Sequence, residues 1–210
     1  MLIAFDFDGT LSDSEMTVLL GEEAGVANEI DEITERAMND KLSYAESLYA
    51  RAELLDGLVE ERVEAAFDRV QLRPGSADVI DALSAAGHHV AILTGGFDRG
   101  VEKALEAEGA SVDTIVANRL PIRNGKLTGN AEGPLIEGTK DDALEELAAE
   151  VGVEMADTVA VGDGANDLPM LEVAGLAVGY EPKPAVEPHC DDVVASMDEL
   201  RELLEERDVL

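Results

Sequence analysis

Apolar and polar positions along the first third of the chain predict a strand followed by helices. Residues 2–5 form a short apolar run that ends at an acid, which predicts a buried strand. From residue 13 to residue 72, apolar side chains recur at helical spacing among charged ones, which predicts an all-helical segment. Within it, Ser43 followed by Glu46 has the spacing of a capping box. A Pro-Gly pair at 74–75 then ends the helical segment.

The rest of the chain alternates between strands and helices. The expected strands cover residues 90–93, 114–117, 158–161, 176–178 and 193–194, and the expected helices cover residues 76–86, 98–108, 139–151, 167–174 and 197–207. Between two extended segments, 119–123 and 126–128, Asn124 and Gly125 predict a β-hairpin with a tight primed turn. Strands that alternate with helices predict a parallel sheet covered by helices on both faces.

These patterns together predict an α/β chain with two parts. The core is a doubly wound, Rossmann-like parallel sheet built from residues 1–12 and 73–210, with the β-hairpin attached. A small all-helical cap, residues 13–72, is inserted after the first strand. A length of 210 residues suits one compact core with a modest insertion.

Three polar clusters follow directly on predicted strands. They cover residues 6–10, 94–97 and 162–167. In open parallel sheets, ligands bind beyond the carboxyl ends of the strands, so we expect the three clusters to meet in space. This placement makes their side chains the candidate functional residues.

Four acids in these clusters suggest a divalent cation. Asp6 and Asp8 lie two residues apart, so their side chains share one face if strand geometry continues. Two close carboxylates repel each other unless a cation or a shared proton intervenes, and Mg²⁺ suits oxygen ligands beside a phosphate. Asp163 and Asp167 supply two more acids in a glycine-rich segment. The simpler alternatives are solvated loop acids at the first pair and a helix cap with a turn at the second.

Phosphate-binding groups are candidates at two further places. Thr94 and Gly95 offer a hydroxyl and backbone N–H groups ahead of a predicted helix, whose N-terminus favours anions. Lys140 is one of only five lysines and stands where a helix begins, an unfavourable place for a cation. A functional lysine there would neutralise phosphate charge and brace the acids. The alternatives are an ordinary glycine turn and a surface lysine.

In their order along the chain, the three clusters and Lys140 resemble the signatures of the haloacid dehalogenase superfamily of phosphatases. Those signatures are a D-x-D-G-T opening, a Thr or Ser after the second core strand, a Lys, and a final acidic G-D-x-x-x-D stretch. Segments 94–97, 117–120, 125–129 and 162–167 further resemble the branch of that family that hydrolyses phosphoserine. The resemblance covers nearly the whole chain, and the helical insertion corresponds to the family's cap.

The resemblance implies a reaction and a role for each candidate. Asp6 would attack phosphorus and form an aspartyl-phosphate, and Asp8 would act as general acid and then as general base. The reaction would be hydrolysis of O-phospho-L-serine to L-serine and phosphate, the last step of serine biosynthesis. One Mg²⁺ per active site would be held by Asp6, the carbonyl of Asp8, Asp163 and Asp167. Phosphoryl oxygens would be held by Thr94, Gly95, Lys140 and Asn166.

The resemblance places substrate recognition in the cap. Glu15 matches the position that faces the substrate's amino group, and Arg51 matches the position that binds its carboxylate, for which a bidentate guanidinium is suited. Met38 and Tyr44 match apolar positions beside the substrate. The alternatives are an early-helix acid for Glu15, a surface ion pair for Arg51, and packing inside the cap for the other two.

Two positions depart from the phosphoserine-hydrolysing branch. Gly9 stands where serine is frequent, and Thr94 stands where serine is usual. Both keep the required turn or hydroxyl, but they leave two alternatives open within the family: another small-metabolite phosphatase, or a phosphotransferase that passes the phosphoryl group to an alcohol. A non-catalytic acidic binding module is an alternative of a different class, and it predicts that one of the chemical positions is missing.

The charge of the chain limits its partners and its environment. The formal net charge is −32, from 47 acidic and 15 basic residues spread along the sequence. Three classes of protein would carry such a charge: a nucleic-acid mimic, an acidic enzyme that works in ordinary salt, and a protein that works in multimolar salt. We favour the last, because like charges strain the compact state, and about 1 M salt shortens the Debye length to roughly 3 Å. We expect neither nucleic acid nor a membrane surface as a partner.

Cysteine and histidine usage adds little chemistry. Cys190 is the only cysteine, so no intrachain disulfide is expected. No apolar run approaches the roughly 20 residues that span a bilayer. We therefore expect a cytoplasmic protein, a monomer or homodimer, that binds a small phosphate ester. His88, His89 and His189 lie outside the clusters and receive no role.

Overall fold

The computed structural model describes residues 1–38 and 41–210, apart from the side chain of Met38. In this part of the chain, six strands form one sheet in the order β3-β2-β1-β6-β7-β8. Their bounds are β1 Leu2–Phe5, β2 His89–Phe97, β3 Thr114–Asn118, β6 Thr158–Gly162, β7 Leu176–Tyr180 and β8 Asp192–Val194. All neighbouring pairs are parallel, as the alternating pattern predicts.

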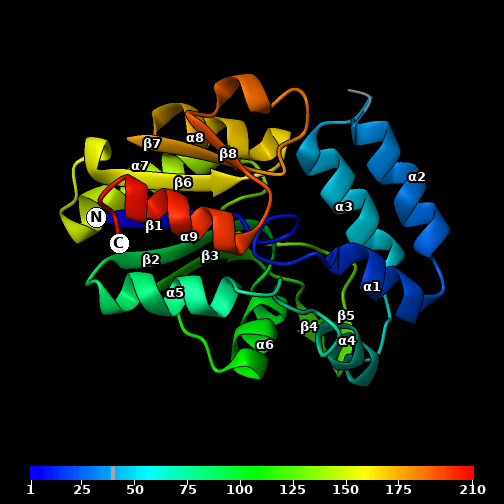
Figure 1. Cartoon of the computed structure of the whole chain (residues 1–210). Helices are drawn as coiled ribbons and strands as arrows, with labels where there is room; N and C mark the ends of the chain where they lie inside the picture. The colour runs from blue at the N-terminus through cyan, green and yellow to red at the C-terminus, as the bar shows by residue number, and fades with distance from the viewer. Residues whose placement is uncertain (39–40) are drawn as a thin grey trace.

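Strand β1 lies at the centre of the sheet and is fully buried (Figure 1). Ile3 and Phe5 belong to the apolar layer on one face of the sheet, whereas Leu2 and Ala4 belong to the layer on the other face. A strand that is covered on both faces needs apolar residues at every position, which explains the uninterrupted run in the sequence.

Helices cover both faces of the sheet. Helices α5, α6 and α9 share the apolar layer of Ile3, and helices α7 and α8 share that of Leu2. Their bounds are α5 Ser76–Ala85, α6 Asp98–Glu108, α7 Lys140–Val151, α8 Leu168–Val173 and α9 Met197–Glu206. Figure 1 shows α5 and α9 in front of the sheet. The doubly wound α/β prediction is therefore confirmed.

The helical insertion lies beside the carboxyl ends of the strands (Figure 1). Its helices among the described residues are α1 Met16–Ala24, α2 Ala27–Met38, α3 Tyr44–Leu54 and α4 Glu60–Phe67. Helix α1 packs against α2 and α4, and α2 packs against α3. The predicted capping box is present: Ser43 Oγ accepts from the backbone N–H of Glu46, and the Glu46 carboxylate accepts from the N–H of Ser43.

A β-hairpin between β3 and α7 contacts the insertion. Strands β4 Ile122–Arg123 and β5 Lys126–Leu127 are antiparallel, and Asn124 (φ 54°) and Gly125 (φ 72°) make the turn with positive φ values, as predicted. Leu127 exchanges backbone hydrogen bonds with the segment between α3 and α4: its N–H donates to Leu58, and its carbonyl accepts from Gly57. The hairpin is thus hydrogen-bonded to the insertion.

Strand β2 is longer than its apolar run. The sequence predicts a strand over residues 90–93 with the Thr94 cluster after it, but β2 continues through that cluster to Phe97. The pairing with β3 is irregular between Leu93 and Phe97. Glycines that permit a bulge let the strand continue while its backbone is redirected, and apolar periodicity does not record this.

None of the described helices is long and apolar enough to cross a membrane.

Candidate active site

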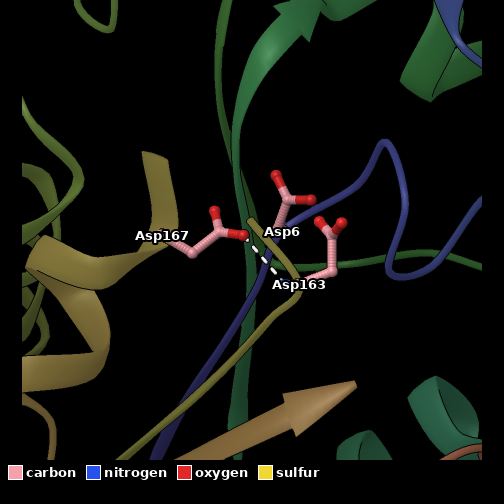
Figure 2. Close-up of side chains that lie close together, drawn as sticks. All are labelled: Asp6, Asp163 and Asp167. Carbon is pink, nitrogen blue, oxygen red and sulfur yellow. Dashed lines mark hydrogen bonds between the residues drawn. The ribbon is translucent and has the colours of Figure 1, made fainter. Parts of the chain in front are cut away.

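Three acids from two strand ends meet at the centre of the carboxyl edge. Asp6 follows β1, and Asp163 and Asp167 follow β6, which is the neighbour of β1 in the sheet. One carboxylate oxygen from each lies within 4.8 Å of the others (Figure 2). The predicted convergence of the first and third polar clusters is therefore present.

Lys140 lies inside this acid cluster. Its Nζ is 2.5 Å from Asp6 Oδ1 and 2.5 Å from Asp167 Oδ1. The three side chains are 4%, 3% and 0% exposed, so water does not solvate their charges. The structure thus excludes the surface-lysine alternative: Lys140 is a buried counter-ion that joins two strand ends.

One lysine does not balance the acids around it. Burial, followed by the neighbouring charge of Asp167, raises the pKa of Asp6 to about 7. Burial also raises the pKa of Asp8 well above its ordinary value, and Glu15 and Asp6 add to this. Among the described residues, Asp6 Oδ2 and Asp8 Oδ1 are buried side-chain oxygens without a hydrogen-bond partner. Unsatisfied buried carboxylate oxygens are the donor set that a hard divalent cation requires.

Asp167 also shapes the backbone of the acid cluster. Its Oδ1 binds Lys140, and its Oδ2 accepts from the backbone N–H groups of Asp163 (2.9 Å) and Gly164 (2.8 Å). The carboxylate therefore fixes the turn that presents Asp163. The helix-cap alternative correctly describes how this carboxylate accepts from backbone N–H groups. The same carboxylate also belongs to the acid cluster.

The turn after β1 packs closely on Asp163. Gly9 has φ +100°, a conformation that favours glycine, and a Cβ there would lie 2.8 Å from the Asp163 carboxyl atoms. The Gly9 N–H donates to the carbonyl of Ser12, and the Ser12 N–H donates to that of Phe7. Glycine at position 9, a departure noted in the sequence, therefore fits the close approach of the two strand ends in this chain.

The Thr94 cluster borders the acid cluster from β2. Thr94 is buried, and its Oγ1 accepts from the backbone N–H of Gly96 (2.9 Å). A Cβ at Gly96 would lie 2.8 Å from Asp8 Oδ2, so this turn and the first acid pair are in close proximity. The carbonyl of Gly95 accepts from Asn118 Nδ2 (3.0 Å), which ties the turn to the end of β3.

Tyr44 connects the insertion to the Thr94 cluster. Its hydroxyl donates to the carbonyl of Gly95 at 2.8 Å. A Cβ at Gly95 would lie 2.1 Å from that hydroxyl oxygen, so only glycine leaves room for the contact. The residue as a whole is 37% exposed, but desolvation of its hydroxyl raises the pKa of Tyr44 to about 12, and the phenol stays a donor. The sequence predicts an apolar role for Tyr44 and does not predict this hydrogen bond. Met38, the other predicted apolar position beside the substrate, has a side chain outside the described part of the structure.

Glu15 and Arg51, the two predicted recognition residues, both belong to the insertion. Glu15 stands just before α1, and desolvation raises its pKa although Lys183 and Arg51 oppose the shift. Arg51 is half-buried, and desolvation lowers its pKa against the opposing charges of Tyr44, Glu15 and Asp8. Its Nη1 donates to Thr17 Oγ1 at 3.1 Å, so a threonine of α1 orients the guanidinium. Both residues interact electrostatically with Asp8: Glu15 raises the pKa of its carboxyl group, and Arg51 lowers it.

A cavity of about 280 Å³ opens beside the phosphate-binding candidates. Its lining includes Lys140, Gly95 and Asn166 from the core and Tyr44 from α3. Asn166 is exposed there. The cavity therefore brings together candidates from four separate parts of the sequence.

Comparisons with known proteins identify the family of the chain. The family model described as haloacid dehalogenase-like hydrolase matches residues 3–172. The chain belongs to this family. A phosphoserine phosphatase of Halobacterium salinarum is 51% identical to this hydrolase over 208 residues, which is 99% of each protein.

Two solved structures share the fold of this hydrolase closely. A phospho-aspartyl intermediate analogue of phosphoserine phosphatase has a TM-score of 0.87 and 42% identity, over 98% of this chain and 97% of that one. A substrate-bound phosphoserine phosphatase complex has a TM-score of 0.88 and 40% identity, with the same coverage.

Three side chains of this hydrolase lie at the site without a signal in the sequence. Thr17 orients Arg51. Arg73 donates to the carbonyl of Gly9 at 3.1 Å. Lys183 pairs with Asp163 at 3.1 Å. All three act across long sequence separations, and each belongs to a residue type that is ordinary on a protein surface, so pattern alone does not select them.

Proposed function

We propose that the protein hydrolyses O-phospho-L-serine to L-serine and phosphate through an aspartyl-phosphate on Asp6. The observation that carries this proposal is the buried cluster in which Lys140 lies between Asp6 and Asp167, with Asp163 beside them. The family membership and the similarity to phosphoserine phosphatases support the same reaction.

Asp6 and Asp8 have different roles in the proposed reaction. An oxygen of Asp6 attacks phosphorus, the bond to the seryl oxygen breaks, and Asp8 donates a proton to that leaving oxygen. Asp8 then removes a proton from water, which attacks the aspartyl-phosphate and releases phosphate. The raised pKa of Asp8 suits an acid that must be protonated before the first step.

The acid cluster fits Mg²⁺. Its carboxylate oxygens lie within 4.8 Å of one another, and Asp6 keeps a buried oxygen without a partner in the described part of the chain. We propose that Asp6, the carbonyl of Asp8, Asp163 and Asp167 hold one Mg²⁺, which neutralises phosphate charge. Thr94, Gly95, Lys140 and Asn166 bind the phosphoryl oxygens in this proposal.

Substrate choice follows from two opposite charges beside Asp8. In the proposed complex, Glu15 faces the ammonium of the substrate and Arg51 binds its carboxylate. Arg51 is oriented by Thr17, which supports its use as a fixed carboxylate receptor. A sugar phosphate has neither group and leaves both charges unpaired.

We also propose how the chain is divided and where it works. Residues 13–72 act as a cap over a core of residues 1–12 and 73–210, and the Tyr44–Gly95 bond supports a cap that rests on the core. The protein is proposed to act in the cytoplasm, in serine biosynthesis, as a monomer or homodimer. Its single cysteine is free, which is compatible with a reducing compartment.

A panel of phosphate esters tests the proposal. We expect kcat/KM for phosphoserine to exceed that for glucose 6-phosphate by about a hundredfold or more, because a site built for polar groups rejects substrates that lack them. Asp6→Asn serves as the control and should abolish turnover. Equal rates on sugar phosphates would exclude phosphoserine as the preferred substrate.

A second measurement separates hydrolysis from phosphoryl transfer. With phosphoserine and excess glycerol, serine and inorganic phosphate should appear in equal amounts if water is the acceptor. Serine released in excess of phosphate would identify a phosphotransferase.

A further inference from the structure

Lys183 places a second ammonium beside the acid cluster. It lies in the loop after β7, where its backbone N–H donates to the carbonyl of Asp163 at 2.9 Å. Its side chain returns to the same residue, with Nζ 3.1 Å from Asp163 Oδ2. Only five lysines are present in the chain, and two of them, Lys140 and Lys183, contact the acid cluster.

The two lysines differ in how firmly they are held. Lys140 is 4% exposed and contacts two carboxylates, whereas the side chain of Lys183 is 53% exposed and contacts one. An ion pair that is half in water contributes little to stability, because solvent screens it and the long side chain loses entropy. Lys183 can therefore leave Asp163 at little cost, and Lys140 cannot leave its partners.

The ammonium of Lys183 lies against one of the proposed metal ligands. Asp163 is a proposed metal ligand, so the ammonium of Lys183 pairs directly with a carboxylate that would bind the incoming cation.

We propose that Lys183 is a tethered counter-ion that occupies Asp163 in the metal-free protein and is displaced when a divalent cation binds. This inference rests on the proposed function, because it takes Asp163 as a metal ligand. Before the metal arrives, the ammonium reduces repulsion among Asp6, Asp163 and Asp167. A divalent cation would supply the same positive charge, so it would compete with Lys183 for Asp163. Lys183 therefore weakens metal binding and sets the cation concentration that the protein needs.

Calorimetric titration with Mg²⁺, without substrate and at fixed salt, tests the competition directly. We expect Lys183→Met to lower the dissociation constant for Mg²⁺ about three- to tenfold. Lys103→Met is the matched control, because Lys103 is also partly exposed (36%) and pairs with Glu64 on α4 and with Asp68 just after it rather than with the acid cluster. It removes the same charge and should shift the constant by less than about twofold.

Thermal unfolding gives a second readout that does not depend on activity. Without Mg²⁺, Lys183→Met should melt below the wild type, because the acids lose a counter-ion. Saturating Mg²⁺ should raise the melting temperature of this variant more than that of the wild type. A side chain that served only to fold the loop would lower both temperatures equally, and that result would overturn the inference. Lys183→Gln, which keeps a polar end, should behave as Lys183→Met.

Asp163→Asn distinguishes a failure of the Lys183 inference from a failure of the proposed metal site. If this variant removes Mg²⁺ binding while Lys183→Met leaves the constant unchanged or weakens binding, the Lys183 inference fails and the metal site stands. If the wild type binds Mg²⁺ and Asp163→Asn does not alter that binding, the metal site of the proposed function is itself wrong.

Discussion

The ammonium nitrogen of Lys140 lies 2.5 Å from a carboxylate oxygen of Asp6, although 134 positions separate the two residues. Lys140 is the first residue of α7, and Asp6 is the first residue after β1. Both are almost fully buried. Removing one partner of such a pair leaves a charge that neither water nor protein compensates, and that cost exceeds the value of the contact itself.

Lys140→Met should impair both folding and catalysis. We expect the free energy of unfolding to fall by about 3–5 kcal/mol, because buried carboxylates lose their counter-ion. Turnover should fall by roughly a hundredfold or more, because a donor to the developing phosphoryl charge is lost. Denaturant unfolding and phosphate release measure the two effects. Lys103→Met, which breaks partly exposed ion pairs, should cost less than about 1 kcal/mol. Full activity in Lys140→Met would remove Lys140 from the reaction.

Arg51→Ala should affect substrates according to their carboxylate. A lost charged hydrogen-bonding partner is worth about 1.5–3 kcal/mol, so KM for phosphoserine should rise roughly 10- to 100-fold. Phosphoethanolamine lacks the carboxylate and should be hydrolysed at a nearly unchanged kcat/KM. Thr17→Val removes only the group that orients Arg51, so it should raise KM for phosphoserine by a smaller factor. An equal loss on both substrates would assign Arg51 to packing rather than to carboxylate binding.

Tyr44→Phe should weaken the contact between α3 and the Thr94 cluster. One hydrogen bond contributes about 0.5–1.5 kcal/mol, so we expect KM to rise roughly two- to tenfold with little change in the melting temperature. Tyr49→Phe is the control, because Tyr49 lies exposed on the same helix. Gly95→Ala should reproduce the effect from the other side, since its Cβ would lie 2.1 Å from the Tyr44 hydroxyl. Unchanged kinetics in both variants would show that the bond has no role in substrate binding.

Arg73→Met should lower turnover although Arg73 contacts none of the acids of the cluster in the described structure. Its guanidinium donates to the Gly9 carbonyl at 3.1 Å and lies 5.0 Å from the centre of the Tyr180 ring. Small displacements of a reacting group are costly, so loosening this turn should reduce kcat about tenfold or more, with a smaller effect on KM. Arg69→Met, which breaks a surface pair with Glu22, is the control and should retain wild-type kcat. A change in KM alone would argue against a positioning role.

Added KCl should stabilise the protein. The net charge of −32 repels itself, and the Debye length shortens from about 10 Å at 0.1 M salt to about 3 Å at 1 M. We therefore expect the melting temperature to rise with KCl, most steeply below about 1 M where screening changes most. A parallel series in sucrose separates screening from general solute exclusion. A melting temperature that is highest in dilute buffer would contradict adaptation to high salt.

Local patterns in the sequence predicted the sheet and most of the candidate site. The apolar run of β1 is interpretable because a strand buried on both faces needs apolar residues throughout. Asp6 and Asp163 were accessible to prediction because the carboxyl ends of neighbouring parallel strands meet. The end of β2 was predicted too early, because a glycine-rich irregular stretch interrupts the apolar pattern while the strand continues to Phe97.

Contacts between distant surface-type residues were not accessible to the same reasoning. Tyr44 was expected to be apolar in role, and its bond to Gly95 depends on how α3 sits over the core. Arg73 and Lys183 belong to residue types that are usually solvated, and nothing next to them in the chain marks them as different. Their roles come from backbone positions set by the packing of whole elements.

Chemical identity and chain position thus determined which residues are candidates for binding metal and phosphate, because strand ends and glycine turns are local features. Tertiary packing alone decided how those residues are charged and held. Lys140 becomes a buried counter-ion only when α7 and β6 pack beside β1, and the exposure of Lys183 depends on the loop after β7. Burial and pairing depend on all surrounding elements at once, and a linear pattern carries no record of them.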